Sequence, residues 1–213
     1  LSFADLLLWL PIRRDEKSWP EGHLAIAQIR PTTAATVFTE DLVGTSINWG
    51  QRPLVDQALS DGEIVRDAKP EQVGQIVIKE ETIPVILNGK ILAVISRHRN
   101  ADLMRQPSKL ELNYREIAHK IYKMVAEGNF PIRNSLYSSE SSPRVGDGLI
   151  RLDVNGTIFF ASPNARSALS RVGFQKELEG ENLGVVFSNL NKGDTQPTDE
   201  SWQTMLNGKS LRR

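Results

Sequence analysis

The sequence predicts an α+β protein of two small domains, each built on an antiparallel sheet with flanking helices. The chain has 213 residues, more than the usual single domain of about 100–150 residues. Two Asn-Gly pairs, Asn88-Gly89 and Asn155-Gly156, each separate two β-rich runs, as hairpin turns do. A long amphipathic stretch precedes a Ser- and Pro-rich segment, which predicts a helix followed by an interdomain linker.

Composition excludes several classes of protein. Hydrophobic residues make up 39% and charged residues 24% of the chain, which is typical of a globular protein and too apolar for disorder. The 26 basic and 26 acidic residues balance, so we expect no nucleic-acid partner. No apolar run approaches the roughly 18 residues that span a bilayer, and we expect no membrane segment. The absence of Cys fits a reducing cytoplasm, where we expect the protein to reside.

Alternating apolar runs begin the first domain. Leu6–Leu10 is an apolar run, His23–Ile29 is mostly apolar, and the charged residues 13–17 lie between them. We therefore expect a strand, a turn and a strand. Apolar residues at helical spacing follow Pro53, which suits the first turn of a short helix that ends near Gly62.

A hairpin and a long helix complete the first domain. The runs Thr82–Leu87 and Ile91–Ile95 flank Asn88-Gly89, the strongest short-range hairpin signal. Residues 109–127 carry apolar side chains every three or four positions and contain no Pro or Gly. This spacing predicts an amphipathic helix of about five turns. Its apolar stripe comprises Leu110, Tyr114, Ile117, Ile121, Met124 and Val125.

A composition shift separates the domains. We assign residues 1–130 to the first domain, 131–147 to a Ser-rich linker and 148–213 to the second domain. In the second domain, strands over residues 148–154 and 157–161 flank the Asn155-Gly156 turn. Ser162 caps a helix that runs to Gly173, with Pro163 at its first position. We expect shorter helical pieces over Glu177–Phe187 and Asp199–Leu206.

The second domain resembles a PAS domain. The resemblance lies in the string Asp153-x-Asn155-Gly156-x-Ile158-x-Phe160-Ala161-Ser162-Pro163-Asn164-Ala165. Gly173 and Leu178-Glu179-Gly180-Glu181-Asn182-Leu183 resemble the helical section of that family. The longer string Ser142-Pro143-Arg144-x-Gly146-Asp147-Gly148-x-Ile150-Arg151-Leu152-Asp153, read together with Ala161–Ala165, is similar to the PdtaS type of actinobacterial sensor histidine kinase.

The first domain supports the same resemblance and looks like the GAF-type domain of those kinases. The similar strings are Leu1-Ser2-Phe3-Ala4-Asp5, Ala27-Gln28-x-Arg30-Pro31, Val43-Gly44-Thr45, Pro53-Leu54-Val55 and Ala126-Glu127-Gly128-x-Phe130-Pro131. The chain departs from the family at Val73-Gly74-Gln75-Ile76, which is shorter, and after Asn189. We expect the N-terminus to be trimmed and the PAS-like domain to be truncated at Arg213.

The resemblance implies the sensory region of a cytosolic two-component sensor histidine kinase. In such proteins GAF and PAS domains precede a dimerisation and phosphoacceptor segment and an ATP-binding domain. The region would control autophosphorylation and phosphotransfer to a cognate response regulator, with ATP and Mg²⁺ used by the full-length kinase. The resemblance and the near-heptad stripe of residues 109–127 together favour a homodimer through this helix. The alternative is the GAF-PAS sensor of a transcription regulator or a phosphatase.

The sequence offers no catalytic constellation for this region alone. The three histidines, His23, His98 and His119, are scattered and have no Cys or His-x-x-x-His companion, so we predict no metal site. His119 lies on the long helix without the Asn pair that follows the phosphoacceptor of the resembled kinases. The PAS-like domain has neither His nor Cys, which argues against His-ligated haem and a Cys–flavin bond. We expect no cofactor in this region and no enzymatic activity of its own.

A pocket between each sheet and its covering helices is the expected site for an unknown small-molecule ligand. In the first domain Trp49 and Arg52 are the candidate contacts. In the second domain the candidates are Phe160, Asn164, Leu169 and Phe187. The alternative interpretation places the aromatic side chains in the core and Arg52 on the surface.

Overall fold

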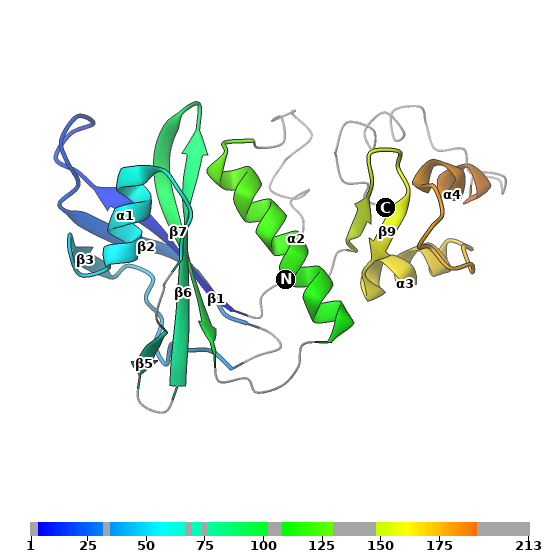
Figure 1. Ribbon diagram of the computed structural model, residues 1–213, viewed down its shortest axis with the longest axis horizontal. Coiled ribbons are helices and arrows are strands. Elements are labelled where there is room, and N and C mark those ends of the chain that lie inside the picture. The colour runs from blue at the N-terminus through cyan, green and yellow to red at the C-terminus, as the bar shows by residue number, and fades with distance from the viewer. Residues whose placement is uncertain are drawn as a thin grey trace. The chain divides into compact units, whose positions relative to one another are not determined.

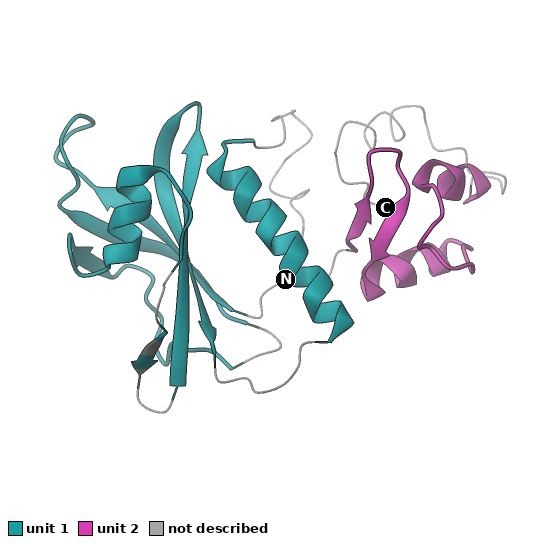
Figure 2. Ribbon diagram, viewed as in Figure 1, with its two compact units in different colours: residues 1–130 teal, residues 131–213 magenta. Residues whose placement is uncertain are grey.

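The computed structural model describes residues 4–31, 35–66, 70–73, 76–101, 108–129 and 148–190. The chain forms two compact units, Leu1–Phe130 and Pro131–Arg213, which Figure 2 shows in separate colours. The predicted linker, 131–147, and the predicted helical piece Asp199–Leu206 lie outside the described residues, as do Gly74 and Gln75 in the shortened loop.

The first unit is built on one antiparallel sheet of seven strands in the order β3-β2-β1-β7-β6-β4, with β5 also paired to β6. The strands are β1 (Asp5–Ile12), β2 (Gly22–Ile29), β3 (Ser46–Asn48), β4 (Val65–Arg66), β5 (Glu71–Val73), β6 (Ile76–Leu87) and β7 (Lys90–Asn100). The predicted strand, turn and strand at the start are confirmed, because β1 pairs antiparallel with β2. Asp15 closes the turn by accepting hydrogen bonds from the backbone N–H groups of Lys17 and Ser18.

The predicted Asn88-Gly89 hairpin is confirmed and joins β6 to β7. Both turn residues have positive φ, 51° at Asn88 and 74° at Gly89, as a two-residue type I′ turn requires. The pairing register shifts by one residue between Val85 and Ile86. This bulge decides which side chains of the two strands face each side of the sheet, since neighbouring residues of a strand point to opposite faces.

Two helices cover the two faces of this sheet. Figure 1 shows α1 (Pro53–Asp61) and α2 (Lys109–Ala126) on opposite sides of β6 and β7. Both helices were predicted, and Gly62 ends α1 in the left-handed conformation that favours glycine. Beneath α1 lies a hydrophobic cluster whose buried members are Leu7, Trp9, Ala25, Val55, Ala58, Leu59 and Val94. Ser108 caps α2 by accepting a hydrogen bond from the backbone N–H of Glu111.

The second unit pairs β8 (Ile150–Leu152) with β9 (Ile158–Ala161) and adds α3 (Pro163–Arg171) and α4 (Leu183–Leu190). The hairpin and α3 agree with the sequence prediction. The predicted helical piece Glu177–Phe187 was partly wrong, because the helix begins only at Leu183. The preceding segment lies along β9: the Gly180 N–H donates to the Ile158 carbonyl, and the Ile158 N–H donates to the Glu181 carbonyl. These tertiary bonds replace the helical ones.

Within the part of the chain that the structure describes, no helix combines the length and the apolarity needed to cross a membrane.

Replacing Ser162 by Ala is expected to destabilise the second unit by about 1 kcal/mol. The Ser162 hydroxyl oxygen accepts hydrogen bonds from the Ala165 N–H at 3.2 Å and from the Leu149 N–H at 2.9 Å. Its loss removes the α3 cap and one tie between α3 and the segment before β8. Amide hydrogen exchange of α3 measures the effect. Ser167→Ala, at an exposed α3 position, is the control, and equal protection in both variants would contradict the prediction.

Candidate functional site

Polar side chains are buried under α1, where an apolar core is the usual arrangement. Asp5, His23, Thr82 and Ser96 have no exposed surface, and His98 is 2% exposed. The strand register explains their common face, since Asp5 lies opposite His98 across β1 and β7, and Thr82 lies opposite Ser96 across β6 and β7. Buried polar groups are costly unless they are hydrogen-bonded, so the contacts of these residues define the site.

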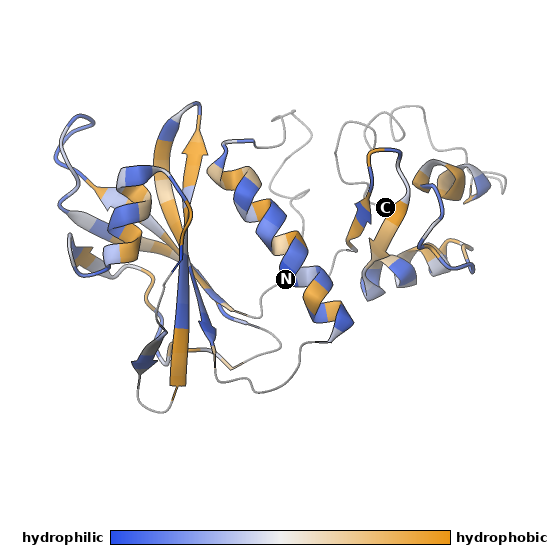
Figure 3. Ribbon diagram, viewed as in Figure 1, coloured by the Kyte–Doolittle hydropathy of each residue, from blue (hydrophilic) through white to orange (hydrophobic). Residues whose placement is uncertain are grey.

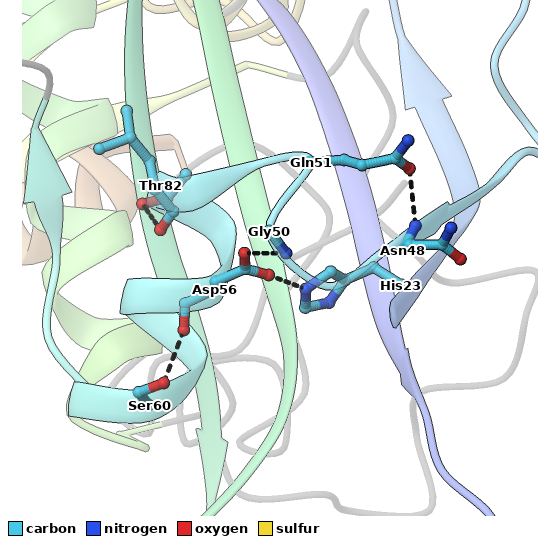
Figure 4. A network of polar contacts seen from close by, with 8 residues as sticks. His23, Asn48, Gly50, Gln51, Asp56, Ser60 and Thr82 are labelled. Carbon is cyan, nitrogen blue, oxygen red and sulfur yellow. Dashed lines mark hydrogen bonds and ion pairs between the residues drawn. The ribbon is translucent and has the colours of Figure 1, made fainter. Parts of the chain in front are cut away.

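A pair between His23 and Asp56 ties α1 to the sheet (Figure 4). His23 Nε2 on β2 lies 2.6 Å from Asp56 Oδ1 in the first turn of α1. We assign Nε2–H as the donor, because a carboxylate accepts. Asp56 Oδ2 accepts a second bond from the Gly50 N–H at 2.7 Å. One carboxylate therefore fixes β2, the loop before α1 and α1 itself.

A second hydrogen-bonded chain runs from Trp9 through Ser96 to His98. Trp9 Nε1–H donates to Ser96 Oγ at 2.8 Å, and Ser96 Oγ lies 2.8 Å from His98 Nε2. Burial, with the nearby positive charge of Arg52 as the smaller cause, lowers the pKa of His98 to about 3. His98 is thus neutral at pH 7, and its Nε2 can accept the Ser96 hydroxyl proton.

Asp5 extends this polar interior to the loop that follows β2. Asp5 Oδ1 accepts from Thr36 Oγ1 at 2.6 Å, and Oδ2 accepts from the Val37 N–H at 2.7 Å. The ring of Phe38, in the same loop, meets the His98 ring edge-on with centroids 4.8 Å apart. The loop is therefore anchored over the buried histidine.

Trp49 and Arg52, the two residues predicted for the first domain, are both half-buried and form an outer layer over the buried residues. Trp49 stacks on His23, with ring centroids 5.5 Å apart. The Arg52 guanidinium lies 5.7 Å from the Trp9 ring centroid, and its Nη1 is 3.8 Å from Glu80 Oε2. Trp49 thus covers His23, and Arg52 covers the Trp9 ring. Their role in ligand binding stays a prediction.

Sequence reasoning missed two buried polar groups on β2. Among the residues that the structure describes, His23 Nδ1 and Gln28 Nε2 have no hydrogen-bond partner. Gln28 Oε1 already accepts the Leu42 N–H at 2.8 Å, so the free amide group is held in place. The sequence signal was a pair of polar residues within a strand that is otherwise apolar. Both atoms therefore keep an unused capacity for a hydrogen bond, and His23 lies directly against the Trp49 ring.

The residues around His98 lack the geometry of a serine-hydrolase triad. Ser96 and His98 are adjacent, yet Glu80 Oε1 approaches the same His98 Nε2, at 3.8 Å. A serine-hydrolase triad instead needs the acid on the opposite ring nitrogen, Nδ1. Ser96 also has no exposed surface for a substrate. In the described ranges no group of three or more His, Asp or Glu residues is placed to hold a metal ion.

In the second unit the predicted contacts are distributed between core and surface. Phe160 and Leu169 are each 7% exposed, and Phe187 packs against the cluster that contains Leu169. Asn164 is exposed in the first turn of α3. The structure therefore brings Leu169 and Phe187 together and leaves Asn164 apart from that cluster. Whether any of the four contacts a ligand stays a prediction.

Comparisons with known proteins point to one family. The family model described as "Histidine kinase PdtaS, GAF domain" matches residues 1–118. The chain is similar to the sensor histidine kinase PdtaS of Mycolicibacterium smegmatis, with 41% identity over 190 residues, 87% of this chain and 37% of that protein. For the same kinase of Mycobacterium tuberculosis the identity is 40% over 221 residues, 100% of this chain and 43% of that protein. The chain therefore spans about two fifths of the length of these relatives.

A solved structure is similar to this chain in both fold and sequence. It is described as the sensor region of a sensor histidine kinase and shares 35% sequence identity with this chain. The match has a TM-score of 0.67 and covers 98% of this chain and 71% of that one.

Lowering the pH from about 7 to 5 is expected to remove about 2 kcal/mol of stability from the first unit. The folded-state pKa of His98, about 3, lies below the ordinary 6.5. The unfolded chain therefore binds the proton first, and stability present above pH 6.5 is lost as the pH falls toward 3. Urea unfolding at both pH values measures the loss.

The variant His98→Gln is expected to lose most of this pH dependence, because its side chain does not titrate. His119→Gln, which replaces an exposed histidine, should retain the full dependence. An unchanged pH slope in His98→Gln would show that another group causes it.

Proposed function

Because the chain belongs to the PdtaS family of sensor histidine kinases, we propose that it is the sensory region of a cytoplasmic two-component kinase. In this proposal the region controls autophosphorylation and phosphotransfer to a response regulator. The kinase region of the full-length protein supplies the phosphoacceptor histidine and binds ATP with Mg²⁺. The sensory region itself contributes ligand binding and a change of packing.

One observation carries this proposal: the family match and the buried polar site coincide. Residues 1–118 match the GAF domain of these kinases, and they include every residue described above beneath α1. Among them, the two free polar groups, His23 Nδ1 and Gln28 Nε2, are the kind of groups that fix the orientation of a small molecule in a site with apolar walls.

The ligand enters by displacing the outer layer. Trp49 and Arg52 are half-buried and are held by ring stacking, a cation–π contact and a 3.8 Å ion pair, which are weaker constraints than the buried bonds beneath. A ligand that replaces the Trp49 ring over His23 also acts on the His23–Asp56 pair. Because Asp56 belongs to α1, ligand binding would change the equilibrium position of that helix.

The second unit is proposed to be PAS-like and to follow the GAF-like unit through a linker. Its support is the hairpin that leads into α3 capped by Ser162, which matches the order of elements that the resemblance implies. A ligand in this unit would contact Phe160, Leu169 and Phe187 from within the core, with Asn164 at its margin. This arrangement requires the cluster to repack around the ligand.

A homodimer through α2 is the proposed route of signal transfer. The apolar stripe of α2 is only partly covered within the chain: Ile117 and Val125 are buried, whereas Leu110 is 40% and Ile121 36% exposed. Figure 3 shows hydrophobic and hydrophilic positions alternating along this helix. A second copy of α2 would cover the exposed part of the stripe.

Replacing Arg52 by Ala in the full-length protein is expected to change the autophosphorylation rate by about fivefold or more, the usual scale of coupling between sites. The apparent KM for ATP should not change, because Arg52 acts on the packing of the sensor. Transfer of the γ-phosphoryl group from labelled ATP measures the rate. Arg13→Ala, in the exposed β1–β2 turn, is the matched control. Identical rates for all three proteins would contradict a regulatory role of this site.

Replacing Ile121 by Glu is expected to convert the dimer to a monomer without unfolding the first unit. The new charge falls on the exposed margin of the stripe, where a dimer interface would bury it at a high cost. Sedimentation velocity of the 213-residue chain gives the mass. Lys120→Glu, one residue away and exposed, should remain dimeric. A wild-type chain that is monomeric at all concentrations would disprove dimerisation of this region.

A further inference from the structure

A basic groove lies on the face of the first-unit sheet that is opposite to the α1 site. It has a volume of about 310 Å³ between β6, β7 and α2. Its basic lining residues, here called the basic cluster, are Arg66, Lys79, Arg97, Arg99 and His119. The whole chain carries no net charge, so the gathering of Arg66, Lys79, Arg97 and Arg99 is a local concentration of positive charge.

Glu81 is a carboxylate that pairs with the cluster from within the groove. Glu81 accepts hydrogen bonds from Arg66 Nε at 2.7 Å and from Arg97 Nη1 at 3.1 Å. The other acidic residue of the lining, Glu80, lies opposite His98 across the strands and has an ion pair with Arg52 on the α1 side. Two arginines therefore share the charge of Glu81.

Lys79 and Arg99 carry the same charge and are neighbours in the sheet. They are directly opposite each other across β6 and β7, a placement that destabilises a sheet when both residues carry the same charge. Neither makes an ion pair or a side-chain hydrogen bond with any residue that the structure describes. Burial, followed by repulsion from Arg97 and Arg115, lowers the pKa of Arg99. The attraction of Glu81 acts in the opposite direction and offsets only part of this effect. The pair of Lys79 and Arg99 is therefore an unfavourable charge arrangement that the fold maintains.

Tyr122 on α2 adds a neutral donor at the edge of this groove. The Arg97 guanidinium lies 5.8 Å from the Tyr122 ring centroid, and burial raises the pKa of the phenol. The hydroxyl therefore keeps its proton at neutral pH and remains able to donate a hydrogen bond.

We propose that the basic cluster binds a compact multivalent anion, one that carries phosphate groups or several carboxylates. A guanidinium offers two parallel N–H donors that match either group, and the groove has room for a small metabolite. The anion would replace the repulsion between Lys79 and Arg99 with shared attraction. Because it would lie between β6, β7 and α2, it would also stabilise the packing of α2 on the sheet. This site is separate from the one beneath α1, and neither depends on the other.

The test uses isothermal titration calorimetry of the 213-residue chain with pyrophosphate and with citrate, each against chloride at the same ionic strength. At least one of the two anions should bind, and the tighter one identifies phosphate or carboxylate as the preferred group. Arg99→Gln and Lys79→Gln should each weaken that binding about tenfold, the value of one charge-assisted bond. Lys90→Gln and Arg13→Gln, at positions away from the groove, should bind as the wild type does.

A thermal melt separates a ligand site from a merely structural cluster. Without anion, Arg99→Gln should melt about 1–3 °C above the wild type, because the substitution relieves repulsion. With saturating anion the order should reverse. Absence of binding by both anions would overturn the proposal. Equal binding by wild type and both groove variants would also overturn it, as would destabilisation of Arg99→Gln without anion.

Discussion

The hydrogen-bonded chain of Trp9, Ser96 and His98 is the constraint on which the first unit depends. All three side chains are almost completely buried, and polar groups in such a position are tolerated only when their hydrogen bonds are satisfied. Ser96 Oγ can accept from Trp9 and donate to His98 only if the imidazole is neutral. The low pKa of His98 is therefore a requirement of the packing, and it fixes the relative positions of β1 and β7 at the centre of the sheet.

The bulge between Val85 and Ile86 sets which side chains of β6 share a face with which side chains of β7. A hairpin continued without it would pair Glu81 with Ser96 and Lys79 with His98, which would place Lys79 and Glu81 beneath α1 in place of Glu80 and Thr82. With the one-residue shift, Glu80 and Thr82 join His98 and Ser96 beneath α1, while Lys79 and Glu81 join Arg99 and Arg97 near α2. A single irregularity thus produces both the buried polar site and the basic groove on the opposite face.

The local elements could be predicted from sequence because their signals are local. Asn88-Gly89 specified its turn, and Pro53 and Ser162 marked the starts of α1 and α3. The site could be predicted only in part. Trp49 and Arg52 were identified from the sequence. The pair His23–Asp56 was not, because it joins residues 33 positions apart. The residues that share each face of β6 and β7 depend on a bulge that no residue pattern predicts. The late start of α4 follows from bonds to β9, a tertiary effect that overrides helical spacing.

Native mass spectrometry of the purified 213-residue chain tests most directly the claim that the residues beneath α1 form a ligand-sensing site. If these residues form such a site, the protein should show a mass excess from a retained small molecule, and the excess should be reduced in Trp49→Ala and Arg52→Ala but not in Arg13→Ala. A chain that carries no small molecule, even after incubation with cell metabolites, or one whose ligand is retained equally by all variants, would contradict it.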